Sequence, residues 1–192
     1  MFQGFSQATV DFMWGIRFNN ERGWFEAHKE DYLTPLYQPM KELGLQAQAA
    51  LVEHFPKEPW NLKVSRIYRD ARRLHGRGPY KDHLWFTLIR GDDSAADTHP
   101  ALWFELTPEG WSCGMGYWCP KASLMERHRA RILRDPKPLL KLARALNRQD
   151  RFILEGQEYR RPKACPQEEL ASWFNKKDLA VSHEEPLTEV LY

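Results

Sequence analysis

The sequence PALWFELTPEGWSCGMGYWCP, residues 100–120, reads as two strands joined by a turn and so predicts an antiparallel hairpin. The turn is TPEG, residues 107–110, where a proline and a glycine interrupt the strand pattern. Because side chains alternate between the two faces of a strand, pairing Leu106 with Trp111 leaves one face apolar. We therefore expect this hairpin to lie in the central sheet, with its apolar face on the core.

The opposite face of the hairpin places Trp103 and Glu105 across from Gly114 and Gly116. Glycine weakens a strand, and two glycines at alternate positions indicate close approach by a ligand or by another backbone. A helix packed tightly on the sheet is the alternative explanation. A carboxylate beside a tryptophan is costly to bury without a partner, which favours a binding site.

Two more strands are predicted upstream of the hairpin. HLWFTLIRG, residues 83–91, is apolar on both faces over most of its length, as in a central strand. Residues 62–69 alternate with a period of two, which places Arg66 on the same face as Leu62 and Val64. An arginine on an apolar face requires an acidic partner or an anionic ligand, because unpaired burial costs on the order of several kcal/mol.

Helical segments are predicted on both sides of the strands. Three lie in the N-terminal part, where Ser6 and Asn20 are the expected caps of the first two. Pro35 and Pro39 predict a kink or a restart before the third. Further helices are expected at residues 121–134, 136–147 and 167–174, and a polar loop at residues 91–100. Helices that flank an antiparallel central sheet indicate an α+β fold, and 192 residues without a linker fit a single domain, residues 1–192.

The composition predicts a cytoplasmic protein without a membrane partner. No apolar run approaches the roughly 18 residues that span a bilayer, and the N-terminus lacks the pattern of a signal peptide. The three cysteines, Cys113, Cys119 and Cys165, contain no CxxC pair. Neither a disulfide framework nor a metal site is therefore indicated.

Positive charge is concentrated in residues 63–83, which include the sequence RIYRDARRLHGRGPYKDH. This segment has seven basic and two acidic residues, although the whole chain has a net charge of only +2. A local excess of this kind is typical of a site for an anion, whereas a general polyanion binder is more often basic throughout.

The predicted ligand site combines this basic segment with the glycine face of the hairpin. Arginine binds phosphate or carboxylate through two parallel hydrogen bonds, and lysine binds them as a point charge. Glu105 and His83 are the candidate acid or base, since histidine titrates near neutral pH. The predicted ligand-binding residues are Arg66, Arg69, Arg72, Tyr80, Lys81, Trp103, Gly114 and Gly116. Alternatively, the segment is a solvated loop in which Asp70 pairs with Arg66 or Arg72.

Charge complementarity also predicts where the basic loop lies. Residues 70–81 carry surplus positive charge, and the glycine face of the hairpin offers space and a carboxylate. We therefore expect the loop to fold over that face. Glu105 would then lie within ion-pair distance of Arg66, Arg69 or Arg72.

Five motifs are spread over nearly the whole chain. They are FxGFS (residues 2–6), NNxxxWFExHKxxY (19–32), RIYRDxR (66–72), PYKxH (79–83) and a glycine-containing strand before WxP (118–120). In this order and spacing they resemble the uncharacterised proteins grouped as domain of unknown function 2461. The chain departs from the family pattern FSKDKxPYK in the basic loop, where residues 73–77 read RLHGR. The resemblance implies an intracellular, single-domain protein and brings no established activity, substrate or cofactor.

Three functions remain, in decreasing order of preference. The first is a basic, aromatic-lined pocket for a small molecule with a phosphate or carboxylate group, with enzymatic activity left open. The second is nucleic-acid binding through residues 66–83, but the acidic remainder of the chain disfavours a specific nucleic-acid partner. The third is a structural or partner-binding protein whose charges form an internal salt-bridge network. The sequence has no P-loop, Rossmann fingerprint or HExxH motif, so it indicates neither a cofactor nor a reaction.

Overall fold

The computed structural model describes residues 1–74, 76–91, 99–117 and 119–187. The predicted polar loop at residues 91–100 therefore lies mostly outside the described residues, as does Trp118 of the last motif. The chain divides into two compact units. Unit 1 comprises Met1–Leu88, Trp103–Cys113 and Glu184–Tyr192, and unit 2 comprises Ile89–Leu102 and Gly114–His183.

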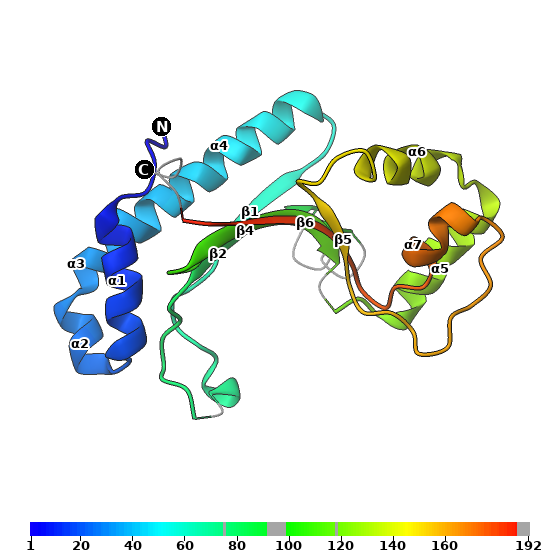
Figure 1. The fold of residues 1–192 in the computed structure, drawn as a ribbon. Helices are drawn as coiled ribbons and strands as arrows, with labels where there is room; N and C mark the ends of the chain where they lie inside the picture. The colour runs from blue at the N-terminus through cyan, green and yellow to red at the C-terminus, as the bar shows by residue number, and fades with distance from the viewer. Residues whose placement is uncertain (75, 92–98, 118, 188–192) are drawn as a thin grey trace. The chain divides into compact units, whose positions relative to one another are not determined.

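Among the described residues, six strands form an antiparallel sheet in the order β1-β2-β3-β4-β6-β5 (Figure 1). The strands are β1 Trp60–Val64, β2 Leu84–Arg90, β3 Ala101–Leu106, β4 Gly110–Tyr117, β5 Ile153–Glu155 and β6 Leu179–Pro186. The register of the last pair places Leu154 of β5 opposite Val181 of β6. The predicted α+β fold with an antiparallel central sheet is confirmed.

The hairpin of β3 and β4 has the predicted turn, and its apolar face packs on the core near the turn, whereas Met115 towards the end of β4 is 41% exposed. The N–H group of Thr107 donates to the carbonyl oxygen of Gly110 at 2.8 Å, which closes the turn. On the core side, the rings of Phe104 and Trp111 stack with their centroids 5.9 Å apart. Glu105 therefore lies on the opposite face of the sheet, because adjacent side chains of a strand alternate.

The N-terminal helices belong to unit 1. They are α1 Gln7–Phe18, α2 Arg22–Ala27, α3 Lys29–Tyr32 and α4 Gln38–His54, with the π-helix η1 Leu33–Tyr37 before α4. Ser6 is the N-cap of α1, as predicted. Pro35 lies in the π-helical turn and Pro39 in the first turn of α4, where a proline costs no helical hydrogen bond. The predicted interruption thus takes the form of a π-helix.

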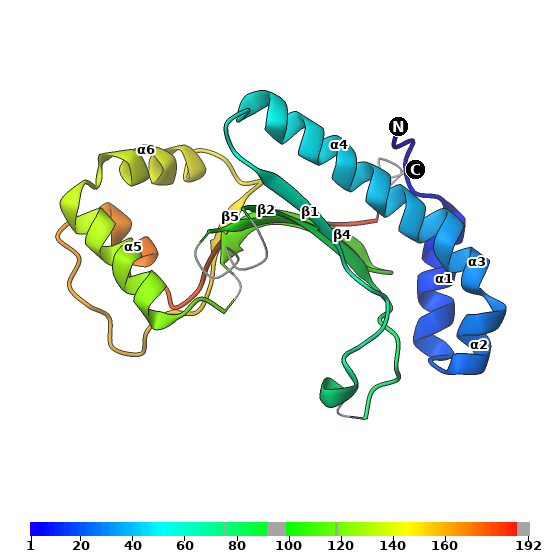
Figure 2. The same ribbon diagram turned by 180° about the vertical axis from the view of Figure 1, so that it is seen from behind.

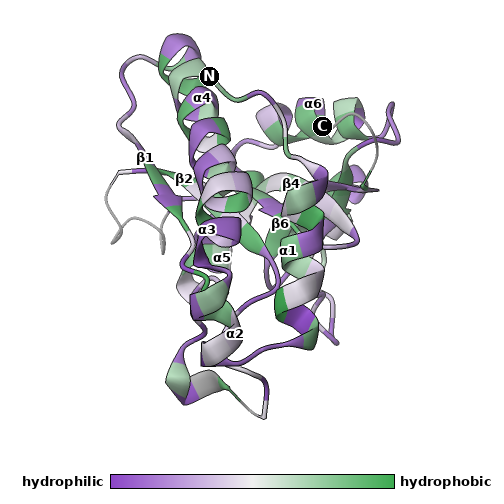
Figure 3. Ribbon diagram, turned by 90° about the vertical axis from the view of Figure 1, so that its left-hand side faces the viewer, coloured by the Kyte–Doolittle hydropathy of each residue, from purple (hydrophilic) through white to green (hydrophobic). Residues whose placement is uncertain are grey.

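Helix α4 crosses one face of the sheet in unit 1 (Figures 1 and 2). The crossing is close at Gly44, where an added Cβ would lie 2.7 Å from Leu62 Cδ1 and 3.4 Å from Phe86 Cγ. Hydrophobic and hydrophilic residues alternate around α1 and α4 (Figure 3), so each helix turns an apolar side to the core. The buried core of this unit includes Phe12, Met13, Ile16, Phe25, Leu36, Met40, Leu84, Phe86 and Leu106.

Unit 2 contains α5 Ala122–Arg134, α6 Lys137–Leu146 and α7 Ala171–Phe174. Its core consists of Ile132, Ala143, Leu170, Trp173 and Phe174, with leucines of α6 packed against it. The predicted helices at residues 121–134 and 136–147 match α5 and α6, and the third is divided into a 3-10 turn and α7. In the part of the chain that the structure describes, every helix is too short or too polar to cross a bilayer.

Three details of the predicted secondary structure were wrong. β1 ends at Val64, and the alternation then shifts, so that Ile67 is buried whereas Arg66 is exposed. The predicted strand at residues 62–69 was therefore too long, and Arg66 does not lie on a buried face. The N-cap of α2 is Glu21 rather than Asn20. Strand β6 was absent from the prediction.

Candidate functional site

At the C-terminal end of the basic loop, residues 70–81, the backbone continues the pairing of β1 with β2. Lys81 donates its backbone N–H to the carbonyl oxygen of Ile67 at 2.7 Å. The Nζ of Lys81 lies 5.5 Å from the ring centroid of Trp85, four residues further along this extended segment. His83 lies between Lys81 and Trp85 in the sequence. Its Nε2 is 3.7 Å from Oε1 of Glu105 in β3. The structure thus brings together three predicted site residues: Lys81, His83 and Glu105.

Asp82 connects this group to the rest of unit 1. Its Oδ2 accepts a hydrogen bond of 2.5 Å from Nε of Arg17 at the end of α1, and its Oδ1 lies 3.5 Å from Nη2 of Arg69. Arg17 also pairs with both carboxylate oxygens of Glu109 in the hairpin turn. Burial raises the pKa of Asp82, but the hydrogen bonds from Arg17 and His83 outweigh this effect and hold the pKa below its ordinary value. Asp82 is therefore a carboxylate at neutral pH.

His83 lies between two carboxylates. Its Nδ1 is 3.0 Å from Oδ1 of Asp82, and Nδ1 carries the hydrogen because an ionised carboxylate only accepts. In the neutral imidazole the basic atom is then Nε2, which faces Glu105. The 3.7 Å between Nε2 and Oε1 of Glu105 is longer than a hydrogen bond, and one oxygen of a bound molecule can contact both atoms. This is the arrangement of a histidine base that is oriented by a carboxylate.

Lys81 is half-buried among other cations. Burial lowers the pKa of its ammonium group, Arg69 and Arg66 lower it further, and Glu105 opposes these effects. Within the described ranges, neither Lys81 nor Arg66 forms an ion pair with a carboxylate. A negative charge added beside Lys81 would therefore stabilise its charged form.

Arg69 and Arg72 are paired within the protein. Arg69 donates from Nε to the carbonyl oxygen of Tyr80 at 2.8 Å, in addition to its contact with Asp82. Arg72 pairs with Asp70 in the exposed part of the loop, with 2.8 Å between Nη2 and Oδ2. This Asp70–Arg72 pair is the one that the interpretation as a solvated loop predicts.

The basic loop follows a different path from the predicted one. It extends away from the sheet on the side opposite α4, next to α1 and α2 (Figures 1 and 2). The side chain of Asn20 donates to the carbonyl oxygen of Tyr80 and accepts from its N–H group, both at 2.9 Å. Gly78 packs directly against Asn20, and an added Cβ there would overlap the carboxamide. The prediction that the whole loop covers the glycine face was wrong. Among the described residues, the basic side chain within 4 Å of the Glu105 carboxylate is His83, at 3.7 Å, rather than an arginine.

Tyr80 belongs to the core rather than to an open face. Its side chain is 2% exposed, and its ring stacks on Phe25 with the centroids 4.3 Å apart. Burial is the main cause that raises the pKa of its hydroxyl group. Because its ring is covered, Tyr80 positions the loop and has no open face on which a ligand could stack.

A neighbouring strand accounts for one of the two hairpin glycines. An added Cβ at Gly116 would overlap the carbonyl oxygen of Leu179 in β6 and lie 2.7 Å from Cα of Ala180. Close approach of another backbone, one of the explanations that the sequence left open, therefore applies to Gly116. Gly114 is buried in the same strand, and Trp103 is half-buried in β3. The binding roles of these three residues stay predictions.

A hollow of about 460 Å³ adjoins Glu105, between the hairpin turn and the end of β6. Its lining includes Glu105, Glu109, Glu184 and Glu185. An acidic lining repels an anion, so a negatively charged ligand belongs on the Lys81 side of Glu105. In the described ranges, no group of three or more His, Cys, Asp or Glu side chains is placed to hold a metal ion.

Sequence reasoning does not find Arg17 and Asp82, although both are central to the cluster. Arg17 lies 65 residues from Asp82 and 92 residues from Glu109, and no local pattern indicates a contact over such separations. The sequence gives only a weak indication that Asp82 belongs to the site. Asp82 is one of two acidic residues among residues 63–83, and it immediately precedes His83.

The fold and this cluster define an α+β protein with a charged side-chain network on one face of its sheet. The chain matches the family described as "Conserved hypothetical protein (DUF2461)" over residues 8–192, and it belongs to this family. The resemblance drawn from the motifs is thereby confirmed. No curated protein matches the chain.

Proposed function

We propose that the chain binds a small molecule with a phosphate or carboxylate group, which lies against Lys81, Arg66 and Arg69. The observation that carries this proposal is the half-buried ammonium group of Lys81, whose pKa is lowered by burial and by two arginines. A bound anion would offset the cost of burial and the repulsion among the cations. The ring of Trp85, 5.5 Å from Nζ, supplies an apolar side for the same ligand.

The internal salt-bridge interpretation accounts for only part of the basic segment. It explains Arg69, which contacts Asp82, and Arg72, which pairs with Asp70. It does not explain Lys81 and Arg66, which have no carboxylate partner among the residues that the structure describes. These two cations are the ones that an anionic ligand would neutralise.

The Asp82–His83 pair supplies the proposed site with an acid–base group. Asp82 keeps the hydrogen on Nδ1, and Nε2 faces Glu105 across 3.7 Å. A hydroxyl group of the ligand that contacts both Nε2 and Oε1 would transfer its proton to Nε2. The reaction class that this arrangement supports is proton transfer on the bound anion.

Titration with inorganic phosphate, followed by isothermal calorimetry and by tryptophan fluorescence, tests the binding proposal. We expect saturable binding that Lys81→Met weakens at least about ten-fold, since the main cation is removed. Lys41→Met is the matched control, because Lys41 is an exposed lysine of α4, and it should leave binding unchanged. Absence of saturable binding, or equal losses in both variants, would remove the basis for the proposal.

We also propose a single domain of residues 1–192 that is located in the cytoplasm. The thiols of Cys113, Cys119 and Cys165 are all free, which is expected in a reducing compartment. Fractionation of cells that express the tagged protein tests the location, and recovery in an extracytoplasmic fraction would contradict it.

A further inference from the structure

A second basic segment, with a larger total charge than residues 63–83, lies in unit 2. Residues 121–151 contain ten basic and three acidic residues, a formal charge of +7, whereas the whole chain carries +2. Most of this segment forms α5 and α6. The proposed small-molecule site lies in unit 1, so this second basic region is independent of it.

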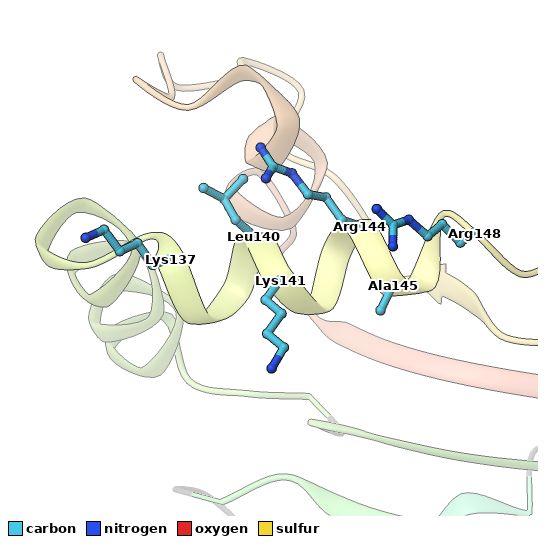
Figure 4. A pocket seen from close by; sticks show the side chains of 6 residues that line it. All are labelled: Lys137, Leu140, Lys141, Arg144, Ala145 and Arg148. Carbon is cyan, nitrogen blue, oxygen red and sulfur yellow. The ribbon is translucent and has the colours of Figure 1, made fainter.

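Helix α6 carries its cations in one stripe. Lys137, Lys141 and Arg144 lie in α6, and Arg148 lies in the turn just after it. Their intervals of four, three and four residues follow the helical spacing. All four are exposed, and Arg144 alone has a carboxylate partner in the described part of the chain, Glu169 at 2.6 Å. The stripe lines a shallow hollow of about 380 Å³ (Figure 4).

The charged groups of this stripe do not converge on a single point. In Figure 4, the ends of Lys137, Lys141 and Arg148 are spread along the helix instead of meeting. Lys137 and Arg148 are eleven positions apart, which corresponds to about 16 Å at a helical rise of about 1.5 Å per residue. Such spacing suits a ligand that repeats its negative charges over a similar length, rather than one small anion.

The apolar side of α6 is already used by the core of unit 2. Ala143 is 1% exposed, and Leu139, Leu140 and Leu146 pack against the buried cluster around Trp173. A helix that lies on a membrane needs a free apolar face to insert between lipids. The surface offered by α6 is therefore cationic and without an insertable face, which favours a nucleic acid over a bilayer.

We infer that this face of α6 binds the phosphate backbone of a nucleic acid, without selection among bases. Binding by phosphate neutralisation needs repeated cations that can follow a strand, and Lys137, Lys141 and Arg148 supply them. The ends of these cations are spread apart instead of converging on one base edge (Figure 4), so they suit contacts to phosphates, which carry no sequence information. The surface is distinct from the basic loop at residues 66–83.

Fluorescence anisotropy with a labelled duplex DNA of about 20 base pairs, at several salt concentrations, tests this inference. Removing the three unpaired cations as Lys137→Gln, Lys141→Gln and Arg148→Gln should lower the salt slope by about 0.9 for each phosphate that is no longer neutralised. At about 50 mM salt this corresponds to a loss on the order of ten-fold in affinity for each such phosphate. Glutamine is a good helix former, so the variant should fold, and circular dichroism checks this.

Helix α5 offers a matched control. Arg127, Arg131 and Arg134 form an exposed stripe of the same charge, again without a carboxylate partner in the described residues. Their replacement by glutamine changes the net charge by the same amount, and we expect a much smaller loss of affinity. Absence of duplex binding at about 50 mM salt, or an equal loss in the α5 variant, would overturn the inference. Tighter binding to phosphatidylserine vesicles than to the duplex would overturn it as well.

Discussion

The two basic segments of the chain differ in how their charges are compensated. In residues 63–83, Arg69 contacts Asp82 and Arg72 pairs with Asp70. Asp82 is shared with Arg17 of α1, and the neighbouring His83 reaches Glu105 of the hairpin. In residues 121–151, Arg129 is buried, the other nine basic residues are exposed, and Arg144 pairs with Glu169. A count of charges along the sequence therefore does not show what the charges do, because the partners come from distant parts of the chain.

This difference separates two kinds of anion recognition. In unit 1 the charges around Asp82 are partly buried, so each depends strongly on its neighbours. The half-buried ammonium group of Lys81 nearby has no carboxylate partner among the described residues, which indicates a site for one small anion. On α6 the charges are exposed and spread, so each contributes little to stability and is available to a polyanion. Changes to single charges in each unit test this contrast.

The largest effect on stability is expected for Asp82→Asn. This change removes the ionised acceptor shared by Arg17 and Arg69, which leaves two partly buried guanidinium groups less well paired. We expect the free energy of unfolding in urea to fall by about 2 to 3 kcal/mol. Asp31→Asn, at an exposed position of α3, is the control and should stay within about 0.5 kcal/mol. Equal effects of the two substitutions would show that the unit 1 charges are no more coupled than surface charges.

Lowering the pH should destabilise unit 1, because it protonates the carboxylates of Asp82 and Glu109. The pKa values of Asp82 and Glu109 lie below their ordinary values in the folded protein, in both cases with a contribution from Arg17. Their stabilisation is therefore present above the ordinary carboxylate pKa of about 4 and is lost as the pH falls through the folded-state values. Urea unfolding between about pH 6 and pH 2 should show this loss. Asp82→Asn should make the curve shallower, and an unchanged slope would contradict the assigned pKa shift.

Lys81→Met should have a smaller effect of the opposite sign. Since the folded protein disfavours the charge on Lys81, its removal should raise the free energy of unfolding slightly. The same variant should lose phosphate binding, so stability and binding change in opposite directions. A loss of stability would show that Lys81 is a structural residue.

The smallest effect is expected at the exposed pair of unit 2. Glu169→Gln removes the carboxylate that Arg144 contacts, but both side chains are about half exposed. The urea midpoint should not change measurably. A clear shift would mean that the charges of unit 2 are as strongly coupled as those around Asp82.

The parts of the fold that follow local rules could be predicted from the sequence. The hairpin was found because its alternation and the TPEG turn lie within residues 100–120, and its closing hydrogen bond joins residues three positions apart. The proximity of Lys81, His83 and Glu105 could be predicted because a basic, aromatic segment and an isolated carboxylate on a strand are both visible locally, whereas their role in a site stays a prediction.

The remaining features depend on contacts between residues that are far apart in the sequence, or on the helical spacing of basic residues. A count of charges along the sequence does not show that spacing. Asn20 has the side chain of a helix cap, but its carboxamide is bound to Tyr80, 60 residues away. Arg66 was misplaced because β1 ends early and the alternation shifts at Ser65. The stripe on α6 was visible as basic residues at helical spacing, although its exposure depends on which side of the helix packs on the core.

The pKa of Lys81, measured by NMR on protein with labelled lysine side chains, tests the central claim most directly. The account predicts a pKa below the ordinary lysine value in the free protein, because the ammonium group is half-buried beside Arg69 and Arg66. It also predicts that saturation with phosphate raises this pKa, since a bound anion stabilises the charged form. An ordinary pKa in the free protein, or a lowered pKa that phosphate leaves unchanged, would contradict the claim.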